Sequence, residues 1–257
     1  MAIEPIIEVE RGARLGREQL KVVKKALAGA NGLCILPSDT AYSLACCPTE
    51  NHVTDDIDRI LDRKNLEMSL AVGSLQMARA VAEISPRGGH FMEAFVPGPL
   101  TFVAPIRKPR LPALAGRDRV ALGPVMLSHK LRGRRRLGIR LTESVIETQT
   151  SEALDFPVTT CAIRAADGTP LTEFDASCRR VAEGAAQVGY ERPIVAVRSE
   201  IPPTRGHSTV VVECTFEDLP ALWVKRVGAI SFDEIEEVGL RLAYHRVFRP
   251  DEPPEGG

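Results

Sequence analysis

The chain alternates short apolar runs with amphipathic segments along its length. Apolar residues near helical spacing over 15–30 predict a helix, and the apolar run 33–36 predicts a buried strand that ends at Pro37. Further strands are predicted at 68–73, 101–106, 137–141, 156–163, 194–199 and 208–214, with a hairpin-like pair over 221–231. Helices are predicted at 54–61, 74–84, 90–96, 144–154, 175–188 and 232–242. This mixture predicts an α/β or α+β fold.

A cluster of polar side chains follows the predicted strand at 33–36. The cluster consists of Ser38, Asp39, Thr40 and Tyr42. It places hydrogen-bond donors and acceptors at the end of the strand, where they suit a small polar ligand. A plain turn between two core strands, with Ser38 and Asp39 capping backbone amides, explains the same residues.

Composition narrows the class of protein. The 257 residues are 44% hydrophobic and 26% charged, which is typical of a globular chain with a sizeable core. No apolar run is long enough to span a bilayer, and the acidic start lacks the features of a signal peptide, so we expect a cytoplasmic protein without a membrane contact. Six cysteines without a CxxC pair and five scattered histidines predict no metal site. Nothing in the composition fixes an oligomeric state.

Charge is distributed unevenly along the chain. The segment 107–136 contains ten Lys or Arg residues and one acid, Asp118, although the net charge of the whole chain is -1. A basic segment without aromatic residues favours contact with polyanions through charge, so RNA is a candidate partner. A solvated surface loop is the simpler interpretation.

Six motifs, in order, resemble the YrdC/YciO-like family, the threonylcarbamoyl-adenylate synthases. The segment PSDTAYSL at 37–44 is similar to the family signature P-T-D-T-x-Y-G-L. The other motifs are PGPLT at 97–101, LGIR at 137–140, PVTTCAI at 157–163, HSTVVVE at 207–213 and VKRVGAI at 224–230. Together they span roughly residues 15–235, which is most of the chain.

The resemblance implies a fold and its boundaries. It implies a single YrdC-like domain over residues 10–240, with a twisted mixed β-sheet curved around an open basic cleft and helices on the outer side. Residues 241–257 are then a C-terminal tail, and the composition of 251–257, DEPPEGG, predicts disorder at its end.

The resemblance also implies a reaction. In the family L-threonine, bicarbonate and ATP condense to a threonylcarbamoyl-adenylate with release of pyrophosphate, which serves the tRNA t6A pathway, and Mg²⁺ shares the charge of the phosphates. This chemistry needs positioned substrates and cations rather than a covalent protein nucleophile. The expected partners are therefore ATP, Mg²⁺, bicarbonate and threonine or a related amino acid.

Positions that match the family's amino-acid pocket are Ser38, Thr40, Tyr42 and Thr160. Ser38 replaces the usual threonine, and Ser43 replaces the usual glycine of the signature. Both changes are small, so the resemblance implies a pocket whose selectivity differs from that of the family.

Arg140 and Lys64 match the positions expected to act on the reacting groups. Arg140 lies in a predicted strand, where a guanidinium offers a fixed fork to carboxylate or phosphate; a structural salt bridge is the alternative. Ser208 and Thr209 match hydroxyls that meet the nucleotide, and Arg226 matches the arginine of an R-x-G motif. Packing in a β-rich region, or an ion pair for Arg226, explains these residues equally well.

The phosphate-binding segment departs from the family pattern K-x-R-P. This chain has Asp62 at the lysine position and Lys64 at the arginine position. Arg59 and Arg63 reach these positions only by a shift of register, so they are further candidates for nucleotide binding. Lysine binds phosphate as a point charge and cannot make the bidentate contact of arginine.

A second departure lies at TTCAIRAADGTP, where typical synthases have S-A-N-x-S-G. Thr160 stands in for the serine, but Ala162 replaces the asparagine and removes a donor and an acceptor. Both departures resemble the YciO branch of the family. Two alternatives to the synthase therefore stay open: an RNA-binding protein that has lost the chemistry, and an enzyme that transfers carbamoyl groups from carbamoyl phosphate.

Overall fold

The strands of the computed structural model form one mixed, open sheet. The structure describes residues 3–10, 12, 14–48, 51–63, 68–107, 129–131, 134–204 and 206–254. The strand order is β1-β9-β2-β3-β8-β4-β7-β5-β10-β11-β12, and β6 pairs with β7 outside this path. The strands are β1 Ile6–Val9, β2 Leu33–Pro37, β3 Tyr42–Ala45, β4 Ser69–Ala71, β5 Leu100–Pro105, β6 His129–Leu131, β7 Arg134–Arg140, β8 Val158–Ala162, β9 Ile194–Ser199, β10 Thr209–Phe216, β11 Leu219–Arg226 and β12 Arg246–Phe248. The predicted α/β class and mixed sheet are confirmed.

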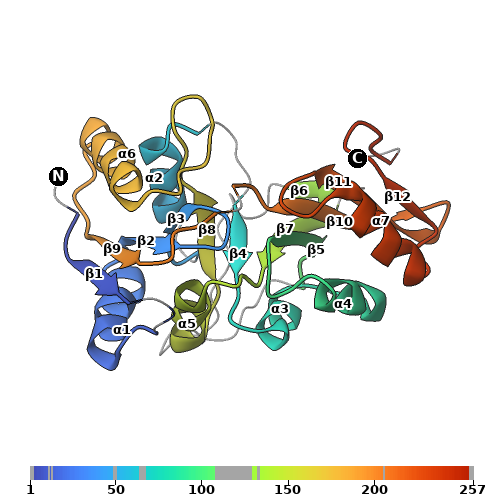
Figure 1. The fold of residues 1–257 in the computed structure, drawn as a ribbon, viewed down its shortest axis with the longest axis horizontal. Helices are drawn as coiled ribbons and strands as arrows, with labels where there is room; N and C mark the ends of the chain where they lie inside the picture. Colours follow the sequence, from blue (N-terminus) through green and yellow to red (C-terminus); the bar gives the residue numbers. More distant parts are fainter. Residues whose placement is uncertain are drawn as a thin grey trace.

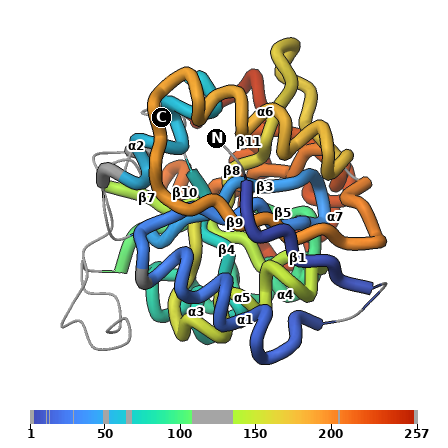
Figure 2. Tube along the Cα trace, turned by 90° about the vertical axis from the view of Figure 1, so that its left-hand side faces the viewer, coloured from blue at the N-terminus to red at the C-terminus, as the bar shows by residue number. Residues whose placement is uncertain are grey.

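Helices cover both faces of this sheet. Figures 1 and 2 show α1, α3, α4 and α5 along one face and α2 and α6 on the other, over the half that contains β3 and β8. α7 packs beside β11 and β12 at the far end. The helices are α1 Arg17–Lys24, α2 Asn51–Ile60, α3 Leu75–Val81, α4 Pro86–Glu93, α5 Val145–Leu154, α6 Phe174–Gln187 and α7 Phe232–Arg241, and a π-helical turn, Lys25–Gly29, extends α1. No helix among the described residues is long and apolar enough to cross a membrane.

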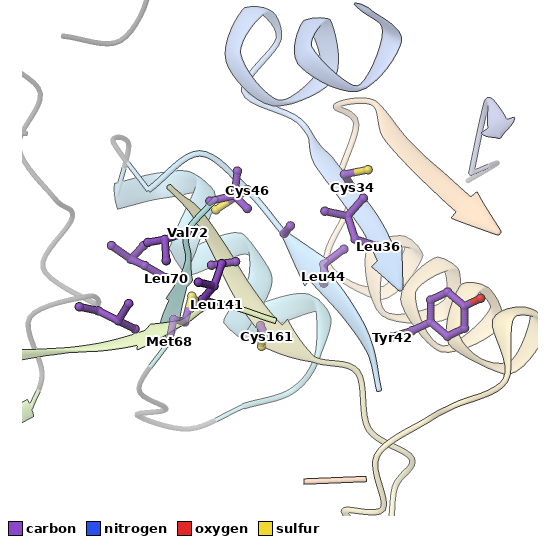
Figure 3. Close-up of a cluster of buried hydrophobic side chains, with 14 of the residues drawn as sticks. Cys34, Leu36, Tyr42, Leu44, Cys46, Met68, Leu70, Val72, Leu141 and Cys161 are labelled. Carbon is purple, nitrogen blue, oxygen red and sulfur yellow. The ribbon is translucent and has the colours of Figure 1, made fainter. Parts of the chain in front are cut away.

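The apolar segment 33–45 forms a hairpin at the centre of one half of the sheet. β2 and β3 pair antiparallel with Ile35 opposite Leu44 and Pro37 opposite Tyr42, so Pro37 extends the strand that was predicted to end there. Figure 3 shows side chains of this hairpin and of β4 in one hydrophobic cluster. Leu36, Leu44 and the neighbouring β4 residue Leu70 are fully buried. Burial of this kind contributes about 1.5–3 kcal/mol for each large apolar side chain.

Two regions of the sheet differ from the sequence-based expectations. The basic segment 107–136 was predicted to be a loop, but its last residues form β6 and the start of β7; residues 108–128 and 132–133 lie outside the described part. The backbone of Arg136 pairs with Pro105 of β5, and its guanidinium donates to the carbonyl of Glu213 in β10. Strand pairing therefore extends into a run of arginines that has no apolar alternation.

The segment assigned to the C-terminal tail is also structured. Residues 246–248 form β12, which pairs parallel with β11, so the sheet reaches beyond the expected boundary at 240. The apolar residues Val247 and Phe248 are buried in this strand. Pro254 is buried as well, although the stretch 251–257 was expected not to pack, and residues 255–257 lie outside the described part. A short apolar pair thus suffices to add an edge strand beyond residue 240.

Candidate functional site

A cleft lies over the middle strands of the sheet and is lined by hydroxyls and basic side chains. Its walls come from the β2–β3 turn, β4, β5, β7, β8 and the segments that join β10 and β11 to their neighbours. The polar residues that line it are Thr40, Arg63, Ser69, Thr101, Arg140, Thr160, Arg164, His207, Ser208 and Arg226. No carboxylate side chain is among the described lining residues, so the cleft carries an excess of positive charge.

Strand alternation places the hydroxyls on one face. In β5, Phe102 packs on Phe91 of α4 with ring centroids 6.0 Å apart, so Thr101 points to the opposite face, where the cleft lies. Ser69 of β4 is directly opposite Thr160 of β8 and shares that face. These positions form the floor of the cleft.

Gly138 keeps this floor open. It lies opposite Ser69 in the pairing of β4 and β7. A Cβ on Gly138 would come within 2.9 Å of Ser69 Oγ and 3.1 Å of Thr101 Cγ2. The glycine of the LGIR motif therefore allows two hydroxyl-bearing side chains to flank a position without a side chain.

One floor hydroxyl lacks a protein partner. Thr101 Oγ1 and Ser208 Oγ lie 2.9 Å apart and share a hydrogen bond. Thr160 is only 6% exposed, and its buried Oγ1 has no hydrogen-bond partner among the described residues. A buried hydroxyl without a partner costs about 1–3 kcal/mol, so a ligand that bonds to Thr160 recovers this free energy.

Arg140 forms a buried ion pair at the edge of the floor. Its Nη2 lies 2.6 Å from Asp39 Oδ1 and 3.2 Å from Thr40 Oγ1. The side chains of Arg140 and Asp39 are 8% and 2% exposed. The pair is monodentate, since Asp39 Oδ2 and Arg140 Nε are buried without hydrogen bonds. Both proposed roles of Arg140, salt bridge and cleft cation, are therefore compatible with its position.

Arg226 is held by the backbone at the start of β10. Its Nε and Nη2 donate to the Ser208 carbonyl at 3.1 and 2.9 Å, and Nη2 also lies 2.9 Å from Ser208 Oγ. A Cβ on Gly228 would lie 2.5 Å from the His207 carbonyl, so the glycine of KRVG permits this close approach. Burial, followed by repulsion from Arg164 and Arg140, lowers the pKa of Arg226 to about 10. The group is still charged at neutral pH.

Two further arginines and a histidine complete the basic rim. Burial lowers the pKa of Arg63 to about 10; the Asp58 carboxylate, 3.9 Å from its Nε, opposes the shift and Arg164 adds to it. Burial also lowers the pKa of Arg164. The pKa of His207 is lowered by burial and by the charges of Arg164 and Arg226, so His207 is neutral at pH 7. These cations repel one another in the absence of an anion.

A buried carboxylate supports the turn that carries Asp39. Glu147 of α5 is fully buried and accepts hydrogen bonds from Ser38 Oγ at 2.8 Å and Ser43 Oγ at 3.2 Å. Ser38 and Ser43 are the two positions at which the segment 37–44 departs from the family signature. In this chain both hydroxyls therefore serve one internal acceptor.

The structure brings six predicted site residues to the cleft. These residues are Thr40, Arg63, Arg140, Thr160, Ser208 and Arg226. Ala162 also lines the cleft and adds no polar group there. Asp62, at the family's lysine position, is exposed at the end of α2 and does not line the cleft.

Other predicted residues lie elsewhere. Tyr42 packs against Phe174 of α6 with centroids 5.6 Å apart, and its ring points away from β4 (Figure 3). Thr209 Oγ1 is bound to the backbone of Ile230 at 2.6 Å. Arg59 bonds to Asp56 and to the Val188 carbonyl on the outer side of α2. These three contacts are structural.

The remaining predicted residues are Ser38 and Lys64. Ser38 faces Glu147, and its segment borders a separate hollow at the start of α5. Lys64 lies outside the described residues.

The sequence analysis did not assign Arg164, His207, Ser69 or Thr101 to the site. Arg164 and His207 lie at the ends of recognised motifs, and alternation along β4 and β5 is the signal by which Ser69 and Thr101 are found. Among the described residues no group of three or more His, Cys, Asp or Glu side chains forms a metal site. The donor set of the cleft instead suits an anion.

Comparison with known proteins gives the same fold. Sua5 from P. abyssi, solved in complex with L-threonine, has a TM-score of 0.69 at 20% identity, with 95% of this chain and 62% of that chain covered. E. coli YciO has a TM-score of 0.63 at 16% identity, with 87% and 95% covered. A hypothetical protein from Streptococcus mutans UA159 has a TM-score of 0.61 at 13% identity, with 96% and 98% covered. The chain thus spans about three-fifths of the Sua5 chain. No curated protein sequence matches it.

The sequence itself matches a family description. Residues 26–218 match the Sua5_yciO_yrdC family, which is described as telomere recombination. The match begins in the helical segment before β2 and ends between β10 and β11, so it includes most of the cleft. On this ground the chain belongs to the Sua5/YciO/YrdC family.

Proposed function

We propose that the protein uses ATP, bicarbonate and L-threonine, or a closely related amino acid, to make a carbamoyl-adenylate with release of pyrophosphate. The observation that carries this proposal is the cleft over β4, β7 and β8, where four arginines and a row of hydroxyls meet without a carboxylate among the described lining residues. Membership of the family and the fold shared with a threonine complex of Sua5 support it.

The proposed chemistry balances without a covalent protein intermediate. The amine nitrogen of the amino acid forms a bond to the bicarbonate carbon, and water leaves. An oxygen of the resulting carbamate then forms a bond to the α-phosphorus of ATP, and the bond from this phosphorus to the bridging oxygen of pyrophosphate breaks. Such a reaction depends on positioning and on stabilising negative charge.

The residues of the cleft divide between these tasks. Arg63, Arg164 and Arg226 are proposed to bind the phosphates, since each guanidinium remains protonated at neutral pH. Arg140 is proposed to bind the carboxylate of the amino acid or the carbamate. The free hydroxyl of Thr160 supplies a hydrogen bond to the same group. This assignment retains Arg140 and Thr160 in the roles that the resemblance implied.

Mg²⁺ fits this site as a companion of the nucleotide. It prefers oxygen ligands and keeps several waters when it binds through substrate phosphates, so it needs few protein ligands. Asp39 Oδ2, which is buried beside Arg140 without a hydrogen bond, and the floor hydroxyls would be candidate oxygen ligands. When bound, the ion supplies charge neutralisation at the phosphates.

Pyrophosphate release tests the proposal. Purified protein with ATP and Mg²⁺ is expected to release pyrophosphate only when both bicarbonate and an amino acid are added, and a panel of amino acids headed by threonine identifies the substrate. Release that occurs without bicarbonate would contradict carbamate formation. If no amino acid of the panel gives pyrophosphate release, and the protein is shown to be folded by a cooperative unfolding transition, the synthase proposal is wrong.

A further inference from the structure

Arg164 occupies a place in the cleft that the motifs did not assign. It follows β8 directly, and its Nη1 donates to the Gly168 carbonyl at 2.8 Å. Gly168 has a φ of +87°, so a glycine favours the turn that presents this carbonyl. Arg164 Nη2 lies 3.4 Å from His207 Nδ1, on the segment before β10. The guanidinium is thus held from two sides.

These contacts do not neutralise Arg164. No carboxylate of the described residues lies within ion-pair distance of its guanidinium, and the same is true of Arg226. Arg164 and Arg63 line the same cleft, and the charge of Arg164 adds to the lowering of the Arg63 pKa that burial causes. An arginine held in place beside other cations, with no counter-ion, is arranged for an anionic ligand.

The neighbouring floor offers a second, independent sign of a ligand. Thr160, two strand positions from the end of β8, has a buried Oγ1 without a partner, and only 6% of the residue is exposed. It lines the same cleft as Arg164. The free hydroxyl, assigned above to the carboxylate or carbamate, indicates that the cleft lined by Arg164 is built for a ligand with acceptor oxygens, and the ionised phosphoryl group of a nucleotide has such oxygens for the guanidinium.

We propose that Arg164 is a phosphate-binding residue of this chain and that Arg164, Arg63 and Arg226 together bind a diphosphate group, the part of a nucleoside triphosphate that leaves as pyrophosphate. The inference rests on the proposed function for the identity of the nucleotide. It explains how the cleft keeps its positive charge although Asp62 stands at the family's lysine position and is directed elsewhere. His207 is a positioning residue for Arg164.

Inorganic pyrophosphate is the direct probe, because its binding requires no turnover. Calorimetric titration of the full chain should give saturable binding, and Arg164→Gln should weaken it about ten- to a hundredfold, as expected for a lost charged hydrogen bond. Arg241→Gln, an exposed arginine of α7 that pairs with Glu237, is the matched control and should bind as the wild type does. Equal affinity of the wild type and Arg164→Gln would overturn the proposal.

Two further results separate this inference from the proposed function. If Arg164→Gln fails to fold, Arg164→Lys decides: it keeps the charge but loses the guanidinium contacts to Gly168 and His207, so pyrophosphate affinity should fall, and unchanged affinity would overturn the proposal that the positioned guanidinium binds the phosphate. Weakened pyrophosphate binding in the variants of a protein that makes no adenylate would uphold the subsite and reject the reaction. Full adenylate synthesis and full pyrophosphate affinity in Arg164→Gln would uphold the reaction and reject the Arg164 subsite.

Discussion

Arg140 and Asp39 form a buried, monodentate ion pair, with 2.6 Å between Nη2 and Oδ1, where the β2–β3 turn meets the end of β7. Removing one member of such a pair leaves a buried charge and typically costs about 3–5 kcal/mol. Arg140→Ala should therefore lower the free energy of unfolding by an amount of this order, measured by urea denaturation. Loss of activity in this variant would then have a structural component.

A double-mutant cycle and a conservative variant separate the contribution of Arg140 to stability from its contribution to activity. Asp39→Ala combined with Arg140→Ala should be less destabilising than the sum of the single changes, with a coupling of about 0.5–3 kcal/mol. Arg140→Lys keeps a positive charge near Asp39, so it should fold with less loss of stability and still lower kcat/KM. Strictly additive effects would show that the interaction between Arg140 and Asp39 contributes nothing to the free energy of unfolding.

Thr160 and Thr159 provide a matched pair of adjacent residues. Thr160→Val removes a hydroxyl that has no protein partner, so stability should stay the same or rise. Affinity for the amino acid, whose carboxylate or carbamate Thr160 is proposed to bind, should fall about tenfold, which corresponds to one hydrogen bond. Thermal unfolding and calorimetric titration check the two parts of this prediction.

Thr159→Val is the control for that experiment. Thr159 Oγ1 accepts from Cys46 N at 2.8 Å and donates to the Cys46 carbonyl, on the face opposite to the cleft. The change should lower the free energy of unfolding by about 1–3 kcal/mol and leave the cleft untouched. The prediction fails if Thr160→Val is the more destabilising of the two.

Glu147 should be essential for the stability of the β2–β3 turn. Glu147→Leu removes the shared acceptor of Ser38 and Ser43 and leaves their hydroxyls only the longer contacts to Asp39 Oδ1 at 3.2 Å and to the Leu36 carbonyl at 3.4 Å, at a total cost of about 1–3 kcal/mol. Glu147→Gln keeps one carbonyl acceptor and should be milder. Chemical denaturation gives both values, and equal stability of the two variants would contradict the role of this acceptor.

Anion binding should depend on pH through His207. Its pKa is lowered below 6.5 by burial and by Arg164 and Arg226, so it is neutral at pH 7 and gains a charge as the pH falls. A bound polyanion favours the protonated form, and loss of the contact in which neutral Nδ1 accepts from Arg164 opposes this; because the new charge acts on the whole polyanion, pyrophosphate affinity should rise as the pH falls below about 6.5. Pyrophosphate itself titrates, and the comparison with His207→Asn isolates the contribution of the imidazole. Identical pH profiles would exclude His207 as the source.

Much of the fold follows from local pattern. The strand at Leu33, the helices that begin after Ser74, Ser144 and Ser231, and the strand at Ile194 agree with the sequence-based predictions, because apolar periodicity and capping residues act over a few neighbours. β6, the start of β7 and β12 were missed. β7 and β12 pair with strands that are distant in sequence, β5 and β11, which a local pattern does not report, and among the described strands β6 pairs only with β7.

The candidate site was only partly predictable for a similar reason. A motif identifies residues that are close in sequence, but the direction of each side chain depends on strand alternation and on neighbouring elements. Tyr42 and Thr209 lie in motifs yet serve the core, whereas Ser69 reaches the cleft from a short strand without a recognised motif and Thr101 from the last position of PGPLT. The role of Glu147 as a shared acceptor requires contacts over more than one hundred residues of sequence.

The most direct test of the proposed function is the fate of the bicarbonate carbon. Protein incubated with ATP, Mg²⁺, threonine and isotopically labelled bicarbonate should form a labelled threonylcarbamoyl-adenylate, detected by mass spectrometry, in amounts equal to the pyrophosphate released. The product should disappear when bicarbonate or the amino acid is omitted. An adenylate without the label, or no adenylate from folded protein that binds pyrophosphate, would contradict the account.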